Sequence, residues 1–279
     1  MSAGWIVTDG AWGTELQAQG LEAGECPDIW NLTRPQAVRG VASAYAAAGS
    51  RIVLTNTFRA NRIALAGYGL ADRVAAINRA GVELSLAGAA GRARVFASLG
   101  PSGKMFAVGE IAEDELRAAF REQAQALAAA GADGLAIETM SDLNEAAMAV
   151  EAARATGLTV VASMVYDSGR NRDRTMTGAT PEQAAARLEA AGADIIGANC
   201  GRGIDAYIAI AARLRAATGR PIWIKPNAGL PEWIDGHVRY RVTPDEFAAL
   251  ARKLEGVSYI GGCCGTTPEH IRALAAACG

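Results

Sequence analysis

Short apolar runs recur along the whole chain and alternate with segments of helical periodicity. The runs are rich in β-branched residues, whereas the segments between them, such as 113–133 and 181–194, are rich in alanine, leucine and glutamate, which favour helix. Near-continuous apolar strands are expected of a parallel sheet covered by helices. The pattern therefore predicts eight strands in a repeated βα order, at 5–10, 51–57, 93–100, 133–139, 159–166, 193–200, 221–229 and 257–264.

Three of the predicted helices end alike, in "AAAGSRIV", "AAAGADGLAI" and "EAAGADIIGA". Gly49, Gly131 and Gly192 stand where a left-handed residue would turn the chain into the next strand. Eight such units favour a single (β/α)8 TIM barrel. The alternative is an open doubly wound sheet, which usually carries G-x-G-x-x-G after its first strand, and "TDGAWGTELQ" lacks that spacing.

The composition adds to this picture of one enzyme-sized domain. Hydrophobic residues make up 51% of the 279 residues and the formal net charge is −2, so we expect no nucleic-acid or membrane partner. No Ser/Gly/Pro-rich linker divides the chain, and we interpret residues 1–279 as one barrel domain. The odd count of five cysteines and the absence of a signal-like N-terminus indicate a cytoplasmic protein.

The ends of the apolar runs are unusually polar. In a barrel of this type the chemistry lies at the carboxyl ends of the strands, so these residues are the first candidates for a site. Three of the five cysteines fall there, one after the sixth run and two after the eighth. In chain order the run ends are Asp9, Asn56 with Thr57, "GPSG" at 100–103, Glu138 with Thr139, Tyr166 with Asp167, Asn199 with Cys200, Asn227, and Cys263 with Cys264.

Three thiolates from two strands would form a three-ligand metal site on Cys200, Cys263 and Cys264. Thiolates favour Zn²⁺ over magnesium or calcium, and catalytic zinc keeps three protein ligands with a fourth position open. Adjacent strand residues point to opposite faces, so the pair requires a broken pleat, which the surrounding glycines allow. A vicinal disulfide or two packed thiols are the alternatives. Neither His237 nor His270 has the spacing of a zinc ligand, and both are interpreted as loop or helix-surface residues.

An open zinc site with three thiolates suits the activation of a thiol substrate. A thiol that took the fourth position would be deprotonated at neutral pH, although its free pKa is roughly 8.5. Methyl transfer to that sulfur would then depend mainly on positioning. The ammonium group of a thiol amino acid calls for carboxylates, and Asp9 and Glu138 lie on the same rim; Asn56 and Asn199 are further candidates for substrate binding. No catalytic residue is assigned beyond the metal site.

The chain also resembles a known family in segments that run from the first strand to the last helix. These are "DGAWGTELQ", "NLTRP", "TNTFRAN", "SLGPSG", "IETMSDLNEA", "GANCG", "KPNAGLP" and "GGCCGTTPEHI". They resemble the zinc-dependent homocysteine S-methyltransferases, and are most similar to the homocysteine-binding domain of cobalamin-dependent methionine synthase. The resemblance implies a (β/α)8 barrel, zinc on Cys200, Cys263 and Cys264, and homocysteine with its amino group near Asp9 and Glu138.

The methyl donor is left open by the sequence. The corrinoid signature D-x-H-x-x-G fails in "DGHVRY", where Tyr240 replaces glycine, so we expect any methylcobalamin to be carried by a separate partner protein. The other donor class is a small sulfonium or betaine-type compound that packs against rim aromatics, for which the candidates are Trp12, Phe58, Trp233 and Tyr240. Two further hypotheses remain: a homocysteine-binding subunit active only with a corrinoid protein, and a metal-free barrel with a redox-active cysteine pair.

Overall fold

In the computed structural model, which describes residues 4–234 and 237–278, eight parallel strands form one sheet. Their order is β1, β10, β7, β6, β5, β4, β3, β2, and a parallel bridge between Thr8 and Ile52 joins the two ends into a barrel. The predicted (β/α)8 fold is confirmed, and the open sheet is wrong. The strands are β1 (Ile6–Val7), β2 (Ile52–Val53), β3 (Arg94–Leu99), β4 (Gly134–Met140), β5 (Thr159–Met164), β6 (Ile195–Cys200), β7 (Ile222–Pro226) and β10 (Tyr259–Ile260).

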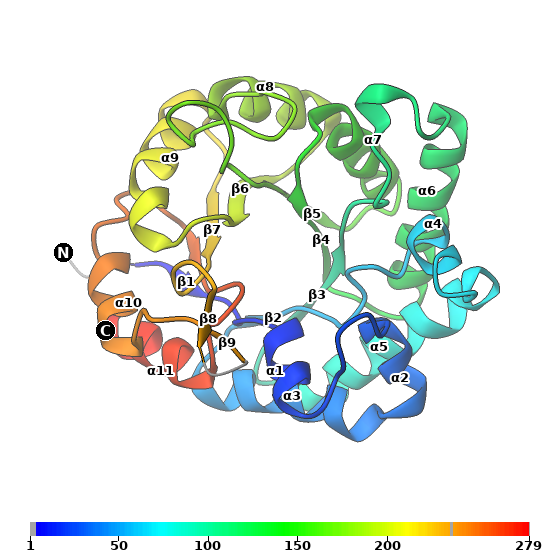
Figure 1. Ribbon diagram of the computed structural model, residues 1–279, viewed down its shortest axis with the longest axis horizontal. Helices are drawn as coiled ribbons and strands as arrows, with labels where there is room; N and C mark the ends of the chain where they lie inside the picture. The colour runs from blue at the N-terminus through cyan, green and yellow to red at the C-terminus, as the bar shows by residue number, and fades with distance from the viewer. Residues whose placement is uncertain (1–3, 235–236, 279) are drawn as a thin grey trace.

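Helices surround the strands as an outer ring (Figure 1). The ring consists of α3 (Pro35–Ala48), α5 (Val74–Ala89), α6 (Glu113–Ala129), α7 (Leu143–Arg154), α8 (Pro181–Ala191), α9 (Ile204–Ala217), α10 (Pro244–Ala251) and α11 (Pro268–Ala277). Shorter helices lie in the loops that follow the first three strands: α1 (Gly13–Ala18), η1 (Pro27–Ile29), α2 (Trp30–Thr33), α4 (Arg62–Ala66), η2 (Ala71–Arg73) and η3 (Phe106–Val108).

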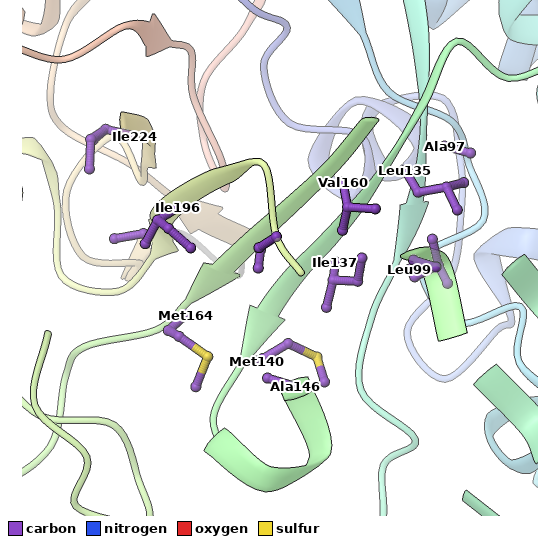
Figure 2. Packing of buried hydrophobic residues seen from close by; sticks show 14 of the residues in the cluster. Ala97, Leu99, Leu135, Ile137, Met140, Ala146, Val160, Met164, Ile196 and Ile224 are labelled. Atoms are coloured by element: carbon purple, nitrogen blue, oxygen red, sulfur yellow. The ribbon is translucent and has the colours of Figure 1, made fainter. Parts of the chain in front are cut away.

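The strands bury both of their faces, which explains why they read as continuous apolar runs. On β4, Leu135 and Ile137 belong to the large core between the strands and the helices, where they lie with Val160 of β5 (Figure 2). Ala136, between them, belongs instead to the smaller core inside the barrel. Side chains alternate along a strand, so Glu138 follows Ala136 on the inner face. The alternation of side chains along each strand thus decides which polar residues point into the barrel interior and which point toward the helices.

The left-handed glycines expected at the helix ends are present. Gly49 and Gly192 are the residues that follow α3 and α8, with φ of 108° and 105°, and Gly131 lies just after α6 with φ of 93°. This backbone region strongly favours glycine, because a Cβ would clash with the carbonyl oxygen. A helix begins directly after the cysteine pair, since Thr267 is the N-cap residue of α11 and Pro268 is its first residue.

A two-stranded antiparallel hairpin interrupts the βα order after β7. Its strands are β8 (Glu232–Ile234) and β9 (His237–Arg239), and the sequence pattern had not predicted it. Asp235 and the side chain of His237, which belong to the imperfect corrinoid signature, lie outside the described residues. Within residues 4–234 and 237–278 no helix combines the length and apolarity needed to cross a membrane. The cytoplasmic location stays a prediction.

Candidate metal and substrate site

The three rim cysteines lie together at the carboxyl ends of β6 and β10. The sulfur atoms of Cys200, Cys263 and Cys264 are all within 4.8 Å of one another, and each residue is partly exposed. Of the His, Cys, Asp and Glu side chains that the structure describes, these form the one group of three or more spaced to hold a metal ion. The other two cysteines, Cys26 and Cys278, lie outside this group. The three rim cysteines are free thiols.

The backbone around the cysteine pair has left the pleated strand. β10 ends at Ile260, and the next two residues pack too closely for any side chain. A Cβ on Gly261 would lie 2.1 Å from the Thr8 hydroxyl oxygen, and one on Gly262 would lie 2.2 Å from the Thr266 hydroxyl oxygen. Both distances are far below van der Waals contact. The glycines therefore allow the tight passage that brings both thiols to one side, as the pair requires.

Cys200 occupies a left-handed backbone conformation with φ of 64°, and Thr139 at the end of β4 has φ of 58°. Such conformations cost non-glycine residues of order 1–3 kcal/mol and often mark functional sites. Asn199 stabilises Thr139, because its Oδ1 accepts a 2.8 Å hydrogen bond from the Thr139 N–H and its Nδ2 donates to the Thr139 hydroxyl at 2.6 Å. The Asn199 side chain is fully buried, and it links the ends of β6 and β4, the two strands that flank β5.

The three thiols share hydrogen bonds that favour negative charge at one position. Cys263 and Cys264 donate to Cys200, which holds the pKa of the Cys200 thiol well below its usual range. The same interaction with Cys200, together with burial, raises the pKa of Cys263. Full ionisation of all three thiols at neutral pH therefore requires an added positive charge. A divalent cation would supply it, and soft sulfur donors in this number match zinc.

Asn227 adds a fourth polar group beside the sulfurs. Its Nδ2 donates to the Gly201 carbonyl oxygen at 2.7 Å, and its amide also hydrogen bonds with the Cys200 sulfur. Its Oδ1 is buried and has no hydrogen-bond partner in the described part of the chain, an arrangement that normally costs free energy. An unpartnered buried oxygen on a residue that contacts a cluster thiol is the feature expected where a metal completes the site. The sequence had placed Asn227 at a run end without assigning it a role.

The cysteine cluster opens into a cavity of about 390 Å³ at the barrel mouth. Glu138 reaches this cavity from β4, where its Oε1 accepts a 2.5 Å hydrogen bond from the Ser98 hydroxyl. Burial raises the pKa of Glu138, and the nearby Lys225 ammonium opposes that rise. The wall of the cavity includes Trp12, Asn56, Phe58, Tyr68, Ser98, Glu138, Thr139, Lys225 and the three cysteines.

Asp9 lies at the barrel interior with both carboxylate oxygens engaged. Its Oδ2 accepts 2.7 Å hydrogen bonds from the Leu54 N–H and the Trp12 indole N–H. Its Oδ1 pairs with the ammonium of Lys225, a buried ion pair that joins β7 to the end of β1. Sequence reasoning missed Lys225, although a lysine inside the apolar run "PIWIKP" is a signal, because lysine is almost never buried unless it is paired.

The two asparagines proposed for substrate binding differ in position. Asn56 lines the cavity, and its Nδ2 donates to the Pro27 carbonyl oxygen at 2.8 Å and to Asn31 Oδ1 at 3.0 Å. Asn199 lies behind the cavity wall, where its amide holds Thr139. Among the aromatic candidates Trp12 and Phe58 line the cavity, whereas Trp233 is 75% exposed on β8.

Two residues near the cysteine pair differ in position or contacts from what the sequence suggests. Tyr240, a candidate rim aromatic, packs over Gly265 and its hydroxyl hydrogen bonds with the Cys264 sulfur. His270 is buried rather than on the surface of α11, because its Nε2 lies 2.9 Å from the Val242 carbonyl oxygen and its Nδ1 interacts with the helix cap at Thr267. The expected surface position of His270 is wrong, and His270 lies outside the cysteine cluster.

Asp28 is a buried carboxyl group that lines the same cavity, and its ionisation can be tested. Burial raises its pKa to about 7 from an ordinary 3.8. The folded protein therefore holds this proton more tightly than the unfolded chain does. The resulting stabilisation is full below pH 3.8 and is lost as the pH rises through about 7, with a limit on the order of 4 kcal/mol.

We expect Asp28→Asn to remove this dependence, because an amide oxygen still accepts from the Arg59 N–H but does not ionise. Thermal unfolding near pH 5 and near pH 8 measures it. The difference in stability between the variant and the wild type should therefore favour the variant more near pH 8 than near pH 5. An equal difference at both pH values would contradict the assignment.

The comparisons with known proteins agree with this geometry. A family model described as homocysteine S-methyltransferase matches residues 6–278. Methionine synthase of Mycobacterium tuberculosis is 34% identical over 98% of this chain and 24% of its own length, and methionine synthase of Mycobacterium leprae is 33% identical over the same shares. The chain thus spans about a quarter of the length of these curated relatives.

Solved structures show the same fold. The metallated form of the homocysteine methyltransferase MmuM from Escherichia coli superposes with a TM-score of 0.80 at 26% identity, over 98% of this chain and 96% of that one. The carboxyl transferase domain of pyruvate carboxylase from Rhizobium etli, at 13% identity and a TM-score of 0.54, shares the fold alone, over 98% of this chain and 46% of that one. On the match over nearly the whole chain, this protein belongs to the homocysteine S-methyltransferase family.

Proposed function

We propose that this protein transfers a methyl group to the sulfur of homocysteine, forming methionine, and that Cys200, Cys263 and Cys264 bind the zinc ion that this reaction needs. The observation that carries the proposal is the placement of three thiols within 4.8 Å of one another on the wall of a cavity that also contains Glu138. A metal site and a carboxylate for an ammonium group thus face the same enclosed space. A thiol amino acid presents the two matching groups.

The residues present fit zinc. Three thiolates favour this ion, and the buried Oδ1 of Asn227 offers a neutral donor that a substrate sulfur can displace. When bound, zinc would lower the pKa of the substrate thiol and hold it as a thiolate at neutral pH. The tight passage of Gly261 and Gly262 positions two of the ligands, and Cys200 contributes the third from the neighbouring side of the barrel mouth.

Glu138 holds the ammonium group of homocysteine in this proposal. Its position on the inner face of β4 aims the carboxylate into the cavity, and the Ser98 hydroxyl fixes one of its oxygens. Asp9 is buried behind it and pairs with Lys225, and Asn56 adds a polar group to the cavity wall. Asn199 acts through Thr139, whose backbone it holds. The chain therefore positions the sulfur for in-line attack, while the donor's bond to the methyl carbon breaks and its electron pair leaves with the donor.

Two donor classes fit different observations. Trp12, Phe58 and Tyr68 line the cavity, and aromatic faces attract a sulfonium or quaternary ammonium cation. The similarity to one quarter of methionine synthase supports the alternative, a homocysteine-binding unit that receives the methyl group from a separate corrinoid protein. In both cases the homocysteine half of the site is the same, and the donor half differs.

A methyl-transfer assay tests the proposed function and separates the donors. Zinc-loaded protein is incubated with homocysteine and, in turn, with S-methylmethionine, glycine betaine, or a corrinoid protein that carries methylcobalamin, and methionine is quantified. We expect methionine to form with at least one donor, at a rate that depends on added protein and zinc. Formation with a small donor alone supports the first class. No methionine with any of the three would contradict the proposal.

A further inference from the structure

Lys225 lies on the inner face of the barrel, at the floor of the cavity. It follows Trp223 by two residues on β7, and Trp223 belongs to the interior core, where its ring stacks on Phe96 with centroids 6.4 Å apart. Side chains two apart on a strand share a face, so Lys225 is placed directly above this aromatic layer. Its side chain is only 3% exposed, yet it forms part of the cavity wall.

The ammonium of Lys225 has more donors than the protein uses. A lysine ammonium carries three N–H donors, and Asp9 Oδ1 is its one hydrogen-bond partner among the described residues. Two donors are therefore left for the space of the cavity. Leaving charged donors without partners in a buried site is costly. Asp9 does not need Lys225 for all of its hydrogen bonds, because Leu54 and Trp12 already donate to its other oxygen.

The charges at the cavity floor add up in a specific way. The three charged groups are Asp9, Glu138 and Lys225. Asp9 and Lys225 neutralise each other, which leaves the Glu138 carboxylate without an opposite charge. Lys225 also lies near enough to Glu138 to act on its ionisation. One free carboxylate matches one ammonium group, and the spare donors of Lys225 match one carboxylate. The floor thus offers both partners that the α-amino and α-carboxylate groups of an amino acid require.

We infer that Lys225 binds the α-carboxylate of the thiol substrate and so selects a zwitterionic amino acid over a simple thiol. This rests on the proposed function, and it names a specificity-determining residue for it. Charge-assisted hydrogen bonds of this kind are short and roughly twice as strong as neutral ones. A carboxylate that loses its ammonium partner should bind about 10- to 100-fold more weakly.

The test compares two ligands that differ only in the carboxylate. Dissociation constants for L-homocysteine and for 3-aminopropane-1-thiol, which lacks the carboxylate, are measured by calorimetry on zinc-loaded wild type and on Lys225→Met. Wild type should prefer homocysteine by about 10-fold or more, and the variant should bind the two thiols nearly equally. Affinity for 3-aminopropane-1-thiol should change little when Asp9 is also replaced by asparagine, because the net charge of the pair then stays at zero.

A second variant separates the loss of Lys225 from the effect of an unpaired buried charge on Asp9. Lys225→Met alone leaves Asp9 without its ion-pair partner, which is strongly destabilising for buried pairs, so Asp9→Asn/Lys225→Met is measured in parallel. The double variant should also have lost its preference for homocysteine. If both variants keep the wild-type preference, the carboxylate assignment is overturned while the proposed function stands. If zinc-loaded wild type binds neither thiol, the proposed function and this inference fall together.

Discussion

Replacing Cys263 by alanine should reduce bound zinc from about one per chain to nearly none after dialysis. Catalytic zinc uses three protein ligands, and removal of one leaves a two-sulfur site that competes poorly with water and chelators. Loss of an outer-shell partner alone costs about 10- to 100-fold in metal affinity, so loss of a direct ligand should cost at least as much. Elemental analysis of protein purified under reducing conditions provides the measurement.

Cys278→Ala is the matched control for this experiment. Its sulfur donates to the Trp5 carbonyl oxygen at 3.0 Å, next to the start of β1 and therefore at the end of the barrel away from the cluster. Zinc content should be unchanged in this variant. Equal zinc in wild type and Cys263→Ala would contradict thiolate ligation by the rim cysteines. Equal loss in both variants would instead indicate a general effect of removing a thiol.

Glu138→Gln should weaken homocysteine binding by roughly 10- to 100-fold while zinc stays bound. The substitution keeps the shape of the side chain and its ability to accept from Ser98, but removes the charge that attracts the ammonium. Calorimetric titration of zinc-loaded protein with homocysteine measures the change. A thiol without the amino group, 4-sulfanylbutanoate, should bind wild type and variant with similar affinity, because its binding does not use Glu138.

Glu122→Gln supplies a control for the loss of one carboxylate elsewhere. Glu122 pairs with Arg62 on the surface, outside the cavity wall, so this change should leave both ligands unaffected. If Glu138→Gln binds homocysteine as tightly as wild type does, the ammonium anchor lies elsewhere in the cavity. If zinc is lost as well, Glu138 supports the metal site and the separation of the two roles is wrong.

The fold was largely predictable because its signals are local. Near-continuous apolar runs indicated strands with both faces buried, and positive-φ glycines such as Gly192 ended the helices where the sequence placed them. The hairpin of β8 and β9 was not predicted. Its signal is present in the sequence, since Asp-Gly follows Trp233 and Ile234 and precedes Val238, and this dipeptide between apolar residues is typical of a hairpin turn.

The site was predictable in part, because positions at strand ends can be read from the sequence whereas contacts between distant inner-face residues cannot. Strand ends meet at one rim in any βα barrel, so Cys200 and the pair at 263 and 264 could be grouped from their positions alone. Their role as zinc ligands stays a prediction. The pairing of Asp9 with Lys225, 216 residues away, depends on which inner-face residues meet at the ends of β1 and β7, which are separated by β10 alone. No local pattern carries that information, although the lysine within an apolar run was a visible anomaly.

X-ray absorption at the zinc edge, with and without homocysteine, tests the central claim most directly. We expect one zinc with three sulfur neighbours and one lighter donor in the free protein, and four sulfur neighbours when homocysteine is added. The added sulfur would report the substrate thiolate itself. A zinc environment that does not change with homocysteine, or protein that retains no zinc under reducing conditions, would contradict the account.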